Sequence, residues 1–303
     1  MIIDESKLAY ARPKTSPAPE VFFTADISPQ GLDAVYKALM AAPEGRIAVK
    51  LSTGEPPNSN YLRPELVGDF IRSLGGKIVE CNTAYGGARS TTADHYKVAE
   101  EHGYSGIAPV DIMDGEAEIS IPVVGGDNLK ENFVGANLAN YDYCVVLTHF
   151  KGHMMAGFGG SIKNISIGIA SAHGKGLIHT GGKADVDIFS GEQEAFLESM
   201  AEAAKSVVDY LHGKLLYINV MNRLSVDCDC DGNPHEPDMH DIGILASYDP
   251  VAIDQACVDL VYAAPDNASL VKRMESRHGI HTVEQAAKIG LGSREYRLIN
   301  LDN

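Results

Sequence analysis

The stretch YCVVLTHFKGHMMAGFGGSIKNISIGIASAHGKGLIH, residues 143–179, combines an apolar run with a loop rich in glycine and histidine. The apolar run, Tyr143–Thr148, is bounded by polar residues, as is typical of a buried parallel strand. In open α/β sheets, ligands bind beyond the carboxyl ends of parallel strands. The stretch therefore predicts an α/β fold whose ligand site lies in residues 149–179.

Patterns typical of strands and helices alternate along the rest of the chain, which indicates parallel strands joined by crossover helices. Further strands are predicted at Arg46–Leu51, Lys77–Glu80, Leu215–Val220 and Ile242–Ala246. Helices are predicted at Pro29–Ala42, Arg63–Leu74, Ala93–His102, Glu192–His212, Pro250–Tyr262 and Val283–Ile289. We expect an α/β protein with two Rossmann-like lobes and mostly parallel sheets: an N-terminal lobe, residues 1–125, and a second lobe, residues 126–303, that carries the loop. Residues 103–139 show little periodicity and are expected to hold short strands and the connection between the two lobes.

The composition excludes several classes of partner. The 303 residues carry a formal net charge of −16, and a field of that sign repels phosphate backbones, so we expect no nucleic-acid partner. No apolar run approaches the roughly 20 residues that span a bilayer, and the first residues, MIIDESKLAY, do not resemble a signal peptide. Five cysteines without framework spacing favour a reducing compartment, and we expect a cytoplasmic protein. The sequence does not indicate the oligomeric state.

The glycines of the loop predict a binding site for a small anionic molecule or cofactor. Glycine lets backbone amides approach an anion closely, and a helix predicted to begin near Ser161 would direct its positive end at the same anion. The expected binding residues are Gly157, Gly159, Gly160, Lys163 and Asn164. A single histidine is more often a core group than a ligand, but four within 31 residues favour a site formed by His149, His153, His173 and His179.

Two other predicted strand ends carry polar loops. The loop after Leu51 offers Thr53 and Arg63 to a carboxylate or phosphate, and a proline-rich turn that caps the next helix is an equal alternative. The loop after Glu80 reads NTAYGGARSTT, and its Arg89 after two glycines favours anion binding.

The segment DCDCDGNPHEPDMH, residues 227–240, is a second candidate metal site. Cys228 and Cys230 lie two apart, so in an extended strand both thiols point to one face, and His235 or His240 would share the metal. The neighbouring aspartates would raise the pKa of both thiols unless a cation lies there. An acidic turn with two free thiols is the alternative. Further along, Asp249 and Pro250 predict a helix start, while Asp254 has either a structural role or orients a ligating histidine.

Three segments resemble one family. They are similar to segments of members of the domain of unknown function 362 family, which are often labelled uncharacterised Fe–S centre proteins. The three segments read THFKGHMMAGFGGSIKNISIGIAS, DCDC and DIGILASYDPVAIDQACVDLV. The resemblance extends from about Arg46 to Tyr262. Many relatives carry a ferredoxin-like insert where this chain reads TGGKADVDIFSG, without cysteine. We therefore expect no Fe–S cluster of the usual ferredoxin type.

The run HMMAGFGGSIK, residues 153–163, resembles a motif of nickel-pincer lactate racemase. The resemblance implies that His153 acts as an acid/base, that Lys163 bonds to a nicotinate-derived nickel nucleotide, and that His179 ligates nickel. In the racemase an earlier loop supplies a second catalytic histidine, and NTAYGGARSTT has none. Two functions stay open. One is an enzyme that acts on a small carboxylate or 2-hydroxy acid by hydride or proton transfer. The other is a non-catalytic metal-binding or electron-transfer scaffold, with His149, His153, His179, Cys228 and Cys230 as candidate ligands.

Overall fold

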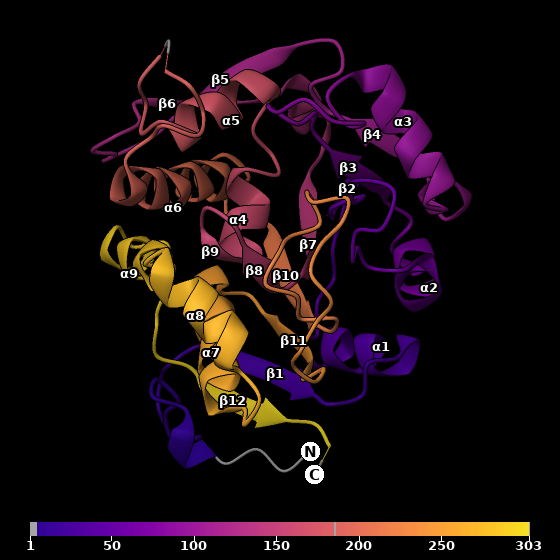
Figure 1. The fold of residues 1–303 in the computed structure, drawn as a ribbon. Coiled ribbons are helices and arrows are strands. Elements are labelled where there is room, and N and C mark those ends of the chain that lie inside the picture. The colour runs from indigo at the N-terminus through magenta and orange to yellow at the C-terminus, as the bar shows by residue number, and fades with distance from the viewer. Residues whose placement is uncertain (1–4, 185, 303) are drawn as a thin grey trace.

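An eight-stranded sheet forms the centre of the computed structural model, which describes residues 5–184 and 186–302 (Figure 1). The strand order is β12-β1-β11-β10-β7-β2-β3-β4, and β11 is antiparallel to both of its neighbours, whereas the other pairs are parallel. The strands are β1 (Glu20–Thr24), β2 (Ile47–Lys50), β3 (Lys77–Glu80), β4 (Val110–Ile112), β7 (Tyr143–His149), β10 (Leu215–Met221), β11 (Gly243–Ser247) and β12 (Arg297–Asn300). The predicted α/β class with mostly parallel strands is confirmed.

Helices cover both faces of the sheet (Figure 1). Successive residues of a strand point to opposite faces, and in β7 Val145 belongs to one apolar core while Val146 belongs to the other. The first core includes α1 (Pro29–Ala38), α2 (Pro64–Leu74) and α3 (Thr92–Glu101). The opposite side carries α4 (Ser161–Ser166), α5 (Ala172–His179), α6 (Gln193–Tyr210), α7 (Pro250–Ala263), α8 (Ala268–Ser276) and α9 (Ile280–Lys288).

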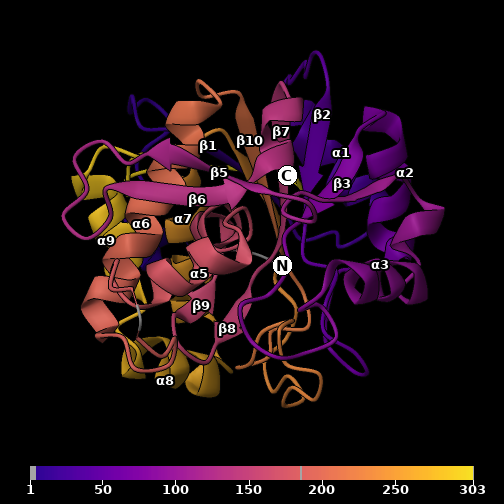
Figure 2. The same ribbon diagram turned by 90° about the horizontal axis from the view of Figure 1, so that it is seen from above.

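Two short ribbons lie outside the central sheet. Strands β5 (Glu118–Pro122) and β6 (Glu131–Gly135) pair antiparallel and lie beside α5 and α6 (Figure 2). Strands β8 (Lys151–His153) and β9 (Gly157–Gly159) form a hairpin directly after β7. The glycine-rich loop is therefore a hairpin followed by α4 and α5. The described part of the chain also contains the 3-10 helices η1 (Glu5–Lys7), η2 (Tyr104–Gly106) and η3 (Ala136–Asn140).

The predicted strands and helices all occur, most with ends that differ by one or two residues. The first predicted helix ends at Ala38 rather than Ala42, because the chain turns at Met40, whose φ is 51°. Residues 103–139 hold β4, β5 and β6, as expected of short strands. Strands from both sides of residue 125 belong to the one large sheet, and the division into two lobes stays a prediction.

Over residues 5–184 and 186–302, every helix is either too short or too polar to cross a lipid bilayer.

Candidate functional site

A cavity of about 440 Å³ lies beyond the carboxyl ends of β2, β3 and β7, next to the β8–β9 hairpin. The predicted place of the ligand site is therefore hollow. Among the described residues that line it, five are basic, Lys50, Arg89, Lys151, Lys163 and Lys175, and two are acidic, Glu80 and Asp229. In a chain with a net charge of −16, this local excess of positive charge suits a small anion.

Glu80, at the end of β3, is the centre of a buried charge network on one wall. Its carboxylate accepts hydrogen bonds from Lys50 Nζ (3.0 Å) and from the backbone N–H of Thr53 (3.0 Å), and lies 3.4 Å from Arg89 Nη1. Arg89 also donates to Glu55 through Nε (3.0 Å). Burial opposes ionisation of Glu80, but the charges of Lys50 and Arg89 outweigh it and lower its pKa to about 2. Arg89 lines the cavity as predicted, yet its guanidinium is already paired.

Asn164 uses its amide to join two strands. Its Oδ1 accepts from Lys50 Nζ (3.0 Å), and its Nδ2 donates to Thr148 Oγ1 (3.0 Å) and to the backbone oxygens of Lys50 and Leu147. The side chain lines the cavity where β2 and β7 end. The Asn164 side chain thus connects the ends of β2 and β7 through hydrogen bonds, and a ligand would have to compete with these contacts.

Asp254 fixes the start of α4, the helix that carries Lys163. Its carboxylate accepts from the backbone N–H groups of Ser161 (2.7 Å) and Ile162 (2.9 Å) and from Asn219 Nδ2 (2.8 Å). A side chain at Gly160 would place its Cβ 2.4 Å from Asp254 Oδ1, so this close approach requires glycine. The positive end of α4 is thus occupied by a carboxylate of the protein, which corrects two expectations. Asp254 caps a helix rather than orienting a histidine, and the helix end is not the anion site.

Lys163 is the cavity lysine that the protein leaves unpaired. Over the described residues, its ammonium has no hydrogen-bond or ion-pair partner, whereas Lys50 and Lys151 both contact carboxylates. Burial, reinforced by the charges of Lys151 and Lys50, lowers the pKa of Lys163 to about 7. A large fraction of this amine is therefore neutral and nucleophilic at physiological pH.

His153 and His179 line the same cavity as Lys163, as the motif predicts, and they present opposite hydrogen-bonding groups. Nδ1 of His179 donates to the carbonyl oxygen of Lys175 (2.7 Å), which leaves the Nε2 lone pair free. Nδ1 of His153 accepts from the backbone N–H groups of Met155 (3.2 Å) and Ala156 (2.9 Å), which puts the hydrogen on Nε2.

Both imidazoles are neutral at physiological pH. Burial is the main cause and Lys163 adds to it, so that the pKa of His179 falls to about 4 and that of His153 falls well below its usual range. His179 thus offers a lone pair to a metal, while His153 offers an N–H.

His149, a third predicted ligand, is used inside the protein. Its Nδ1 contacts Asp229 Oδ1 (2.8 Å) and its Nε2 contacts the carbonyl oxygen of Asn222 (2.6 Å). In this arrangement a metal would have to displace one of these two partners. Lys151 lies 2.9 Å from the other oxygen of Asp229. Burial opposes ionisation of Asp229, but His149 and Lys151 outweigh it and lower its pKa.

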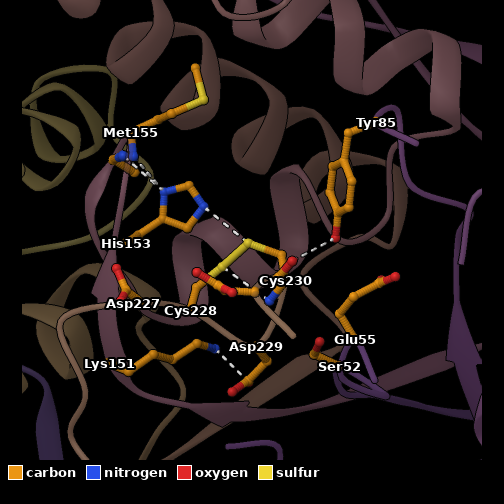
Figure 3. Close-up of a disulfide and its surroundings, with 12 residues drawn as sticks. Ser52, Glu55, Tyr85, Lys151, His153, Met155, Asp227, Cys228, Asp229 and Cys230 are labelled. Atoms are coloured by element: carbon orange, nitrogen blue, oxygen red, sulfur yellow. Dashed lines mark hydrogen bonds and ion pairs between the residues drawn. A yellow bond between two sulfur atoms is a disulfide. The ribbon is translucent and has the colours of Figure 1, made fainter. Parts of the chain in front are cut away.

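Cys228 and Cys230 form a disulfide in the cavity wall, on the side where His153 lies (Figure 3). The sequence predicted a metal site formed by these two cysteines, with an acidic turn that holds two free thiols as the alternative. Instead the sulfurs are bonded to each other, Asp229 is neutralised as described above, and Asp227 is paired with His235 and Arg273. Ligand atoms of His153, Cys228 and Cys230 lie within 4.8 Å of one another, so the group meets the distance criterion for a metal site. Thiolates would be available to a metal after reduction.

Several other predicted residues have structural roles. Thr53 is fully buried, and its Oγ1 contacts His95 Nε2 at 3.0 Å behind the cavity wall. Arg63 lies over the ring of Tyr61, 3.9 Å from the centroid, and donates to the carbonyl oxygen of Ser59. Gly157, with φ at 80°, packs against Gly279, where a Cβ would approach to 2.9 Å. These three residues are not among the described residues that line the cavity, whereas Gly159 and Gly160 are, and their predicted contacts with a cofactor stay a prediction.

The remaining histidines of the two predicted clusters pair with carboxylates elsewhere. His173 contacts Glu118 (2.9 Å), His235 contacts Asp227 and His240 contacts Asp266 (2.7 Å). None of these three is among the described residues that line the cavity or form the group with the cysteines. The predicted sharing of a metal by His235 or His240 with the cysteines is not found.

Comparison with family models gives one match, to the family described as Domain of unknown function (DUF362), over residues 47–259. The chain belongs to the DUF362 family. The matched segment contains all of the described residues that line the cavity, from Lys50 to Cys230, so the cavity is a feature of the DUF362 part of the chain.

The solved structures that resemble this DUF362 chain include the following two. One is the lactate racemase apoprotein from Thermoanaerobacterium thermosaccharolyticum, with 13% identity, a TM-score of 0.45, and coverage of 85% of this chain and 58% of that one. The other is a Thermotoga maritima protein from a structural genomics consortium, with 13% identity, a TM-score of 0.45, and coverage of 78% and 57%. The chain thus spans less than three fifths of either structure. No curated protein matches it.

Sequence reasoning missed Lys50, Glu80 and Glu55, which build one wall of the site in this DUF362 protein. A signal for two of them was present. The apolar runs IAVK and KIVE each end in a charged residue at the carboxyl end of a buried strand, where water is scarce and a partner is required. Glu55 lies in an irregular loop and carries no such signal.

Proposed function

We propose that this protein is an enzyme that binds a small carboxylate or 2-hydroxy acid in the cavity and transfers a proton or hydride on it. The observation that carries the proposal is the Lys163 amine. It faces a cavity lined by an excess of basic side chains, and it has no partner of its own among the described residues. Lys163 is partly buried, and an amine withdrawn from water without a counter-ion is costly for folding; groups of this kind are characteristic of functional sites.

In this proposal Lys163 has two roles, one in its protonated form and one in its neutral form. As an ammonium it attracts the substrate carboxylate, and as a neutral amine it accepts a proton or forms a covalent bond. The pKa of about 7, caused first by burial and then by Lys151 and Lys50, gives both forms in comparable amounts at neutral pH. Lys50, Lys151 and Arg89 are each paired with a carboxylate, so the positive excess of the cavity comes mainly from Lys163 and from Lys175, which donates to the carbonyl oxygen of Ala170.

His153 is assigned the role of a neutral hydrogen-bond donor. Because Nδ1 accepts two backbone N–H groups, Nε2 carries a hydrogen and points into the cavity. A neutral imidazole that donates in this way stabilises the negative charge that develops on a substrate carbonyl or alkoxide oxygen. This differs from the acid/base role that the racemase motif implies, since the lone pair of Nδ1 is not available to take a proton.

The nickel nucleotide that the motif implies fits the residues present. Lys163 offers a nucleophilic amine for a covalent bond, and His179 offers a free Nε2 lone pair held in position by the Lys175 carbonyl oxygen. The basic walls suit a nucleotide phosphate. When bound, such a group would supply a hydride acceptor held by Lys163 and His179, and in that state Lys163 would not act as a free amine toward the substrate.

The wall opposite His153 favours reaction at one face of the substrate. It carries Tyr85, whose hydroxyl is bonded to Arg89 Nη2 (3.0 Å) and to the carbonyl oxygen of Cys230 (3.4 Å) (Figure 3). Burial raises the pKa of this hydroxyl, so it is not a base at neutral pH. Two-sided racemisation requires a second base, and the proposal is accordingly for stereospecific transfer.

Isothermal titration calorimetry with the two enantiomers of lactate as probes tests the proposal. We expect binding at pH 6 that weakens at least severalfold at pH 8, where Lys163 is neutral, and that is lost in Lys163→Met. Lys205→Met is the matched control, since this partly buried lysine lies away from the cavity and pairs with Asp209 on α6. Mass analysis of natively purified protein for an adduct on Lys163, with nickel content, tests the cofactor separately. Binding that is unchanged in Lys163→Met would contradict the proposal.

A further inference from the structure

The disulfide between Cys228 and Cys230 is placed where reagents can reach it. Both cysteines line the cavity, and Cys230 is partly exposed whereas Cys228 is buried, with 6% of its surface exposed. The other three cysteines, Cys81, Cys144 and Cys257, are buried free thiols. An external thiol therefore meets the Cys230 sulfur first.

The disulfide bond contributes little to the stability of the fold. A disulfide stabilises a protein mainly by closing a loop in the unfolded chain, and the stabilisation grows with the length of that loop. Here a single residue, Asp229, separates the two cysteines, and Asp229 is already held by His149 and Lys151. The pair is thus poorly suited to a purely structural role.

Each sulfur has a hydrogen-bond donor that stabilises it as a leaving thiolate. The backbone N–H of Cys230 donates to the Cys228 sulfur at 3.2 Å. Nε2 of His153, which carries a hydrogen because Nδ1 accepts two amides, lies 3.9 Å from the Cys230 sulfur (Figure 3). The nearby carboxylate of Asp229 does not oppose the thiolates, because Lys151 and His149 neutralise it.

We propose that Cys228 and Cys230 are a redox-active pair that undergoes thiol–disulfide exchange with an external dithiol at the cavity. This activity goes beyond the proposed function and does not depend on it. The thiolate of the dithiol attacks Sγ of Cys230, the Cys228–Cys230 bond breaks, and Cys228 leaves as a thiolate beside the Cys230 N–H. The second thiol of the reagent then attacks the mixed disulfide, releases Cys230 next to His153, and departs as a disulfide. The two thiol protons of the reagent end on Cys228 and Cys230, so two electrons and two protons enter the protein.

Native alkylation tests the exchange. The full-length protein is treated with dithiothreitol without denaturant, then with N-ethylmaleimide, and the labelled cysteines are identified by peptide mapping. We expect labels on Cys228 and Cys230 only after reduction, while the buried Cys81, Cys144 and Cys257 stay unlabelled and serve as internal controls. Reduction that requires denaturant, or a pair that is already two thiols in protein purified under air, would overturn the proposal.

Single variants test the order of attack and the part played by His153. Incubated with oxidised glutathione, Cys228→Ser should form a mixed disulfide at Cys230 faster than Cys230→Ser forms one at the more buried Cys228. For the His153 part, His153→Asn in the Cys228→Ser background keeps an acceptor for the two amides and removes Nε2. We expect three- to tenfold slower release of glutathione by dithiothreitol, the effect of one lost hydrogen bond. An unchanged release rate would overturn the role of His153, and equal rates for the two single variants would overturn the order.

Discussion

Sγ of Cys230 lies 3.9 Å from Nε2 of His153, and the opposite nitrogen of that ring is fixed by two backbone amides. The imidazole therefore cannot exchange its two nitrogens without losing the bonds to Met155 and Ala156. This contact joins the hairpin β8–β9 to the segment after β10 across one wall of the cavity. His153 thus has two proposed roles, as the hydrogen-bond donor to the substrate and as the hydrogen-bond donor to Cys230 of the redox pair.

Lys163→Met is expected to stabilise the protein. The folded state lowers the lysine pKa to about 7, so the unfolded state binds the proton better, and stability is lost as the pH falls toward 7. Removing the amine should raise the free energy of unfolding by about 1–2 kcal/mol at pH 7, less than the full pKa shift because the side chain is only partly buried. The gain should become smaller at pH 10 and should disappear well above the unfolded lysine pKa of about 10.4, where both states are neutral.

Urea denaturation at pH 7 and pH 10 measures this, with Lys50→Met as the matched control. Lys50 is buried and paired with Glu80, so its loss leaves this buried carboxylate with Arg89 as its remaining cationic partner and should cost about 3 kcal/mol. A Lys163→Met protein that is less stable than wild type at both pH values would contradict the assignment of an unpaired, costly amine.

Asp254→Asn is expected to weaken the site indirectly, because Asp254 holds the start of the helix that carries Lys163. The backbone N–H groups of Ser161 and Ile162 at the start of α4 donate to the two oxygens of Asp254, and in the variant one of these oxygens is replaced by an NH₂ group that cannot accept. We expect a loss of about 2–3 kcal/mol in unfolding free energy. Because α4 carries Lys163, lactate binding should weaken together with stability. Asp249→Asn is the comparison, since Asp249 caps α7 in the same way, away from the cavity. Equal losses of lactate binding in both variants would refute the link.

Soft metals should bind the cysteine pair only after its reduction. Thiolates ligate zinc, whereas the sulfurs of a disulfide are poor ligands. With Zn²⁺ as the probe, we expect calorimetric binding to reduced wild type that is absent from the oxidised protein and from the Cys228→Ser, Cys230→Ser double variant. Zinc binding of equal strength in all three would show that the metal lies elsewhere.

The sequence predicted those parts of the fold that depend on local pattern. The buried strands β2, β3, β7, β10 and β11 are continuous apolar runs, and they were identified nearly to the residue. Strand β1, EVFFT, was missed because five residues with a charged start give no clear period, and β12 was missed for the same reason. Both strands take their conformation from pairing in the sheet, where β12 is the edge strand and β1 lies between β12 and β11.

The site was predicted in outline but not in its contacts. The motif from His153 to Lys163 predicted a site after the strand, and most of its residues do line the cavity. The partners of Asp254 and Glu80 lie 92 and 30 residues away, and no local pattern indicates such pairings. Arg63 and Thr53 were assigned from residue type alone, and tertiary packing turned both away from the cavity.

The central claim is that Lys163 is the reactive group that meets the substrate. Competitive labelling of lysines with acetic anhydride between pH 5 and 11, resolved by peptide mass spectrometry with and without lactate, tests it most directly. We expect Lys163 to titrate near pH 7, to be protected by lactate, and to differ from the exposed Lys97, which lies on α3. A Lys163 that titrates near pH 10, or that lactate leaves fully reactive, would contradict the account.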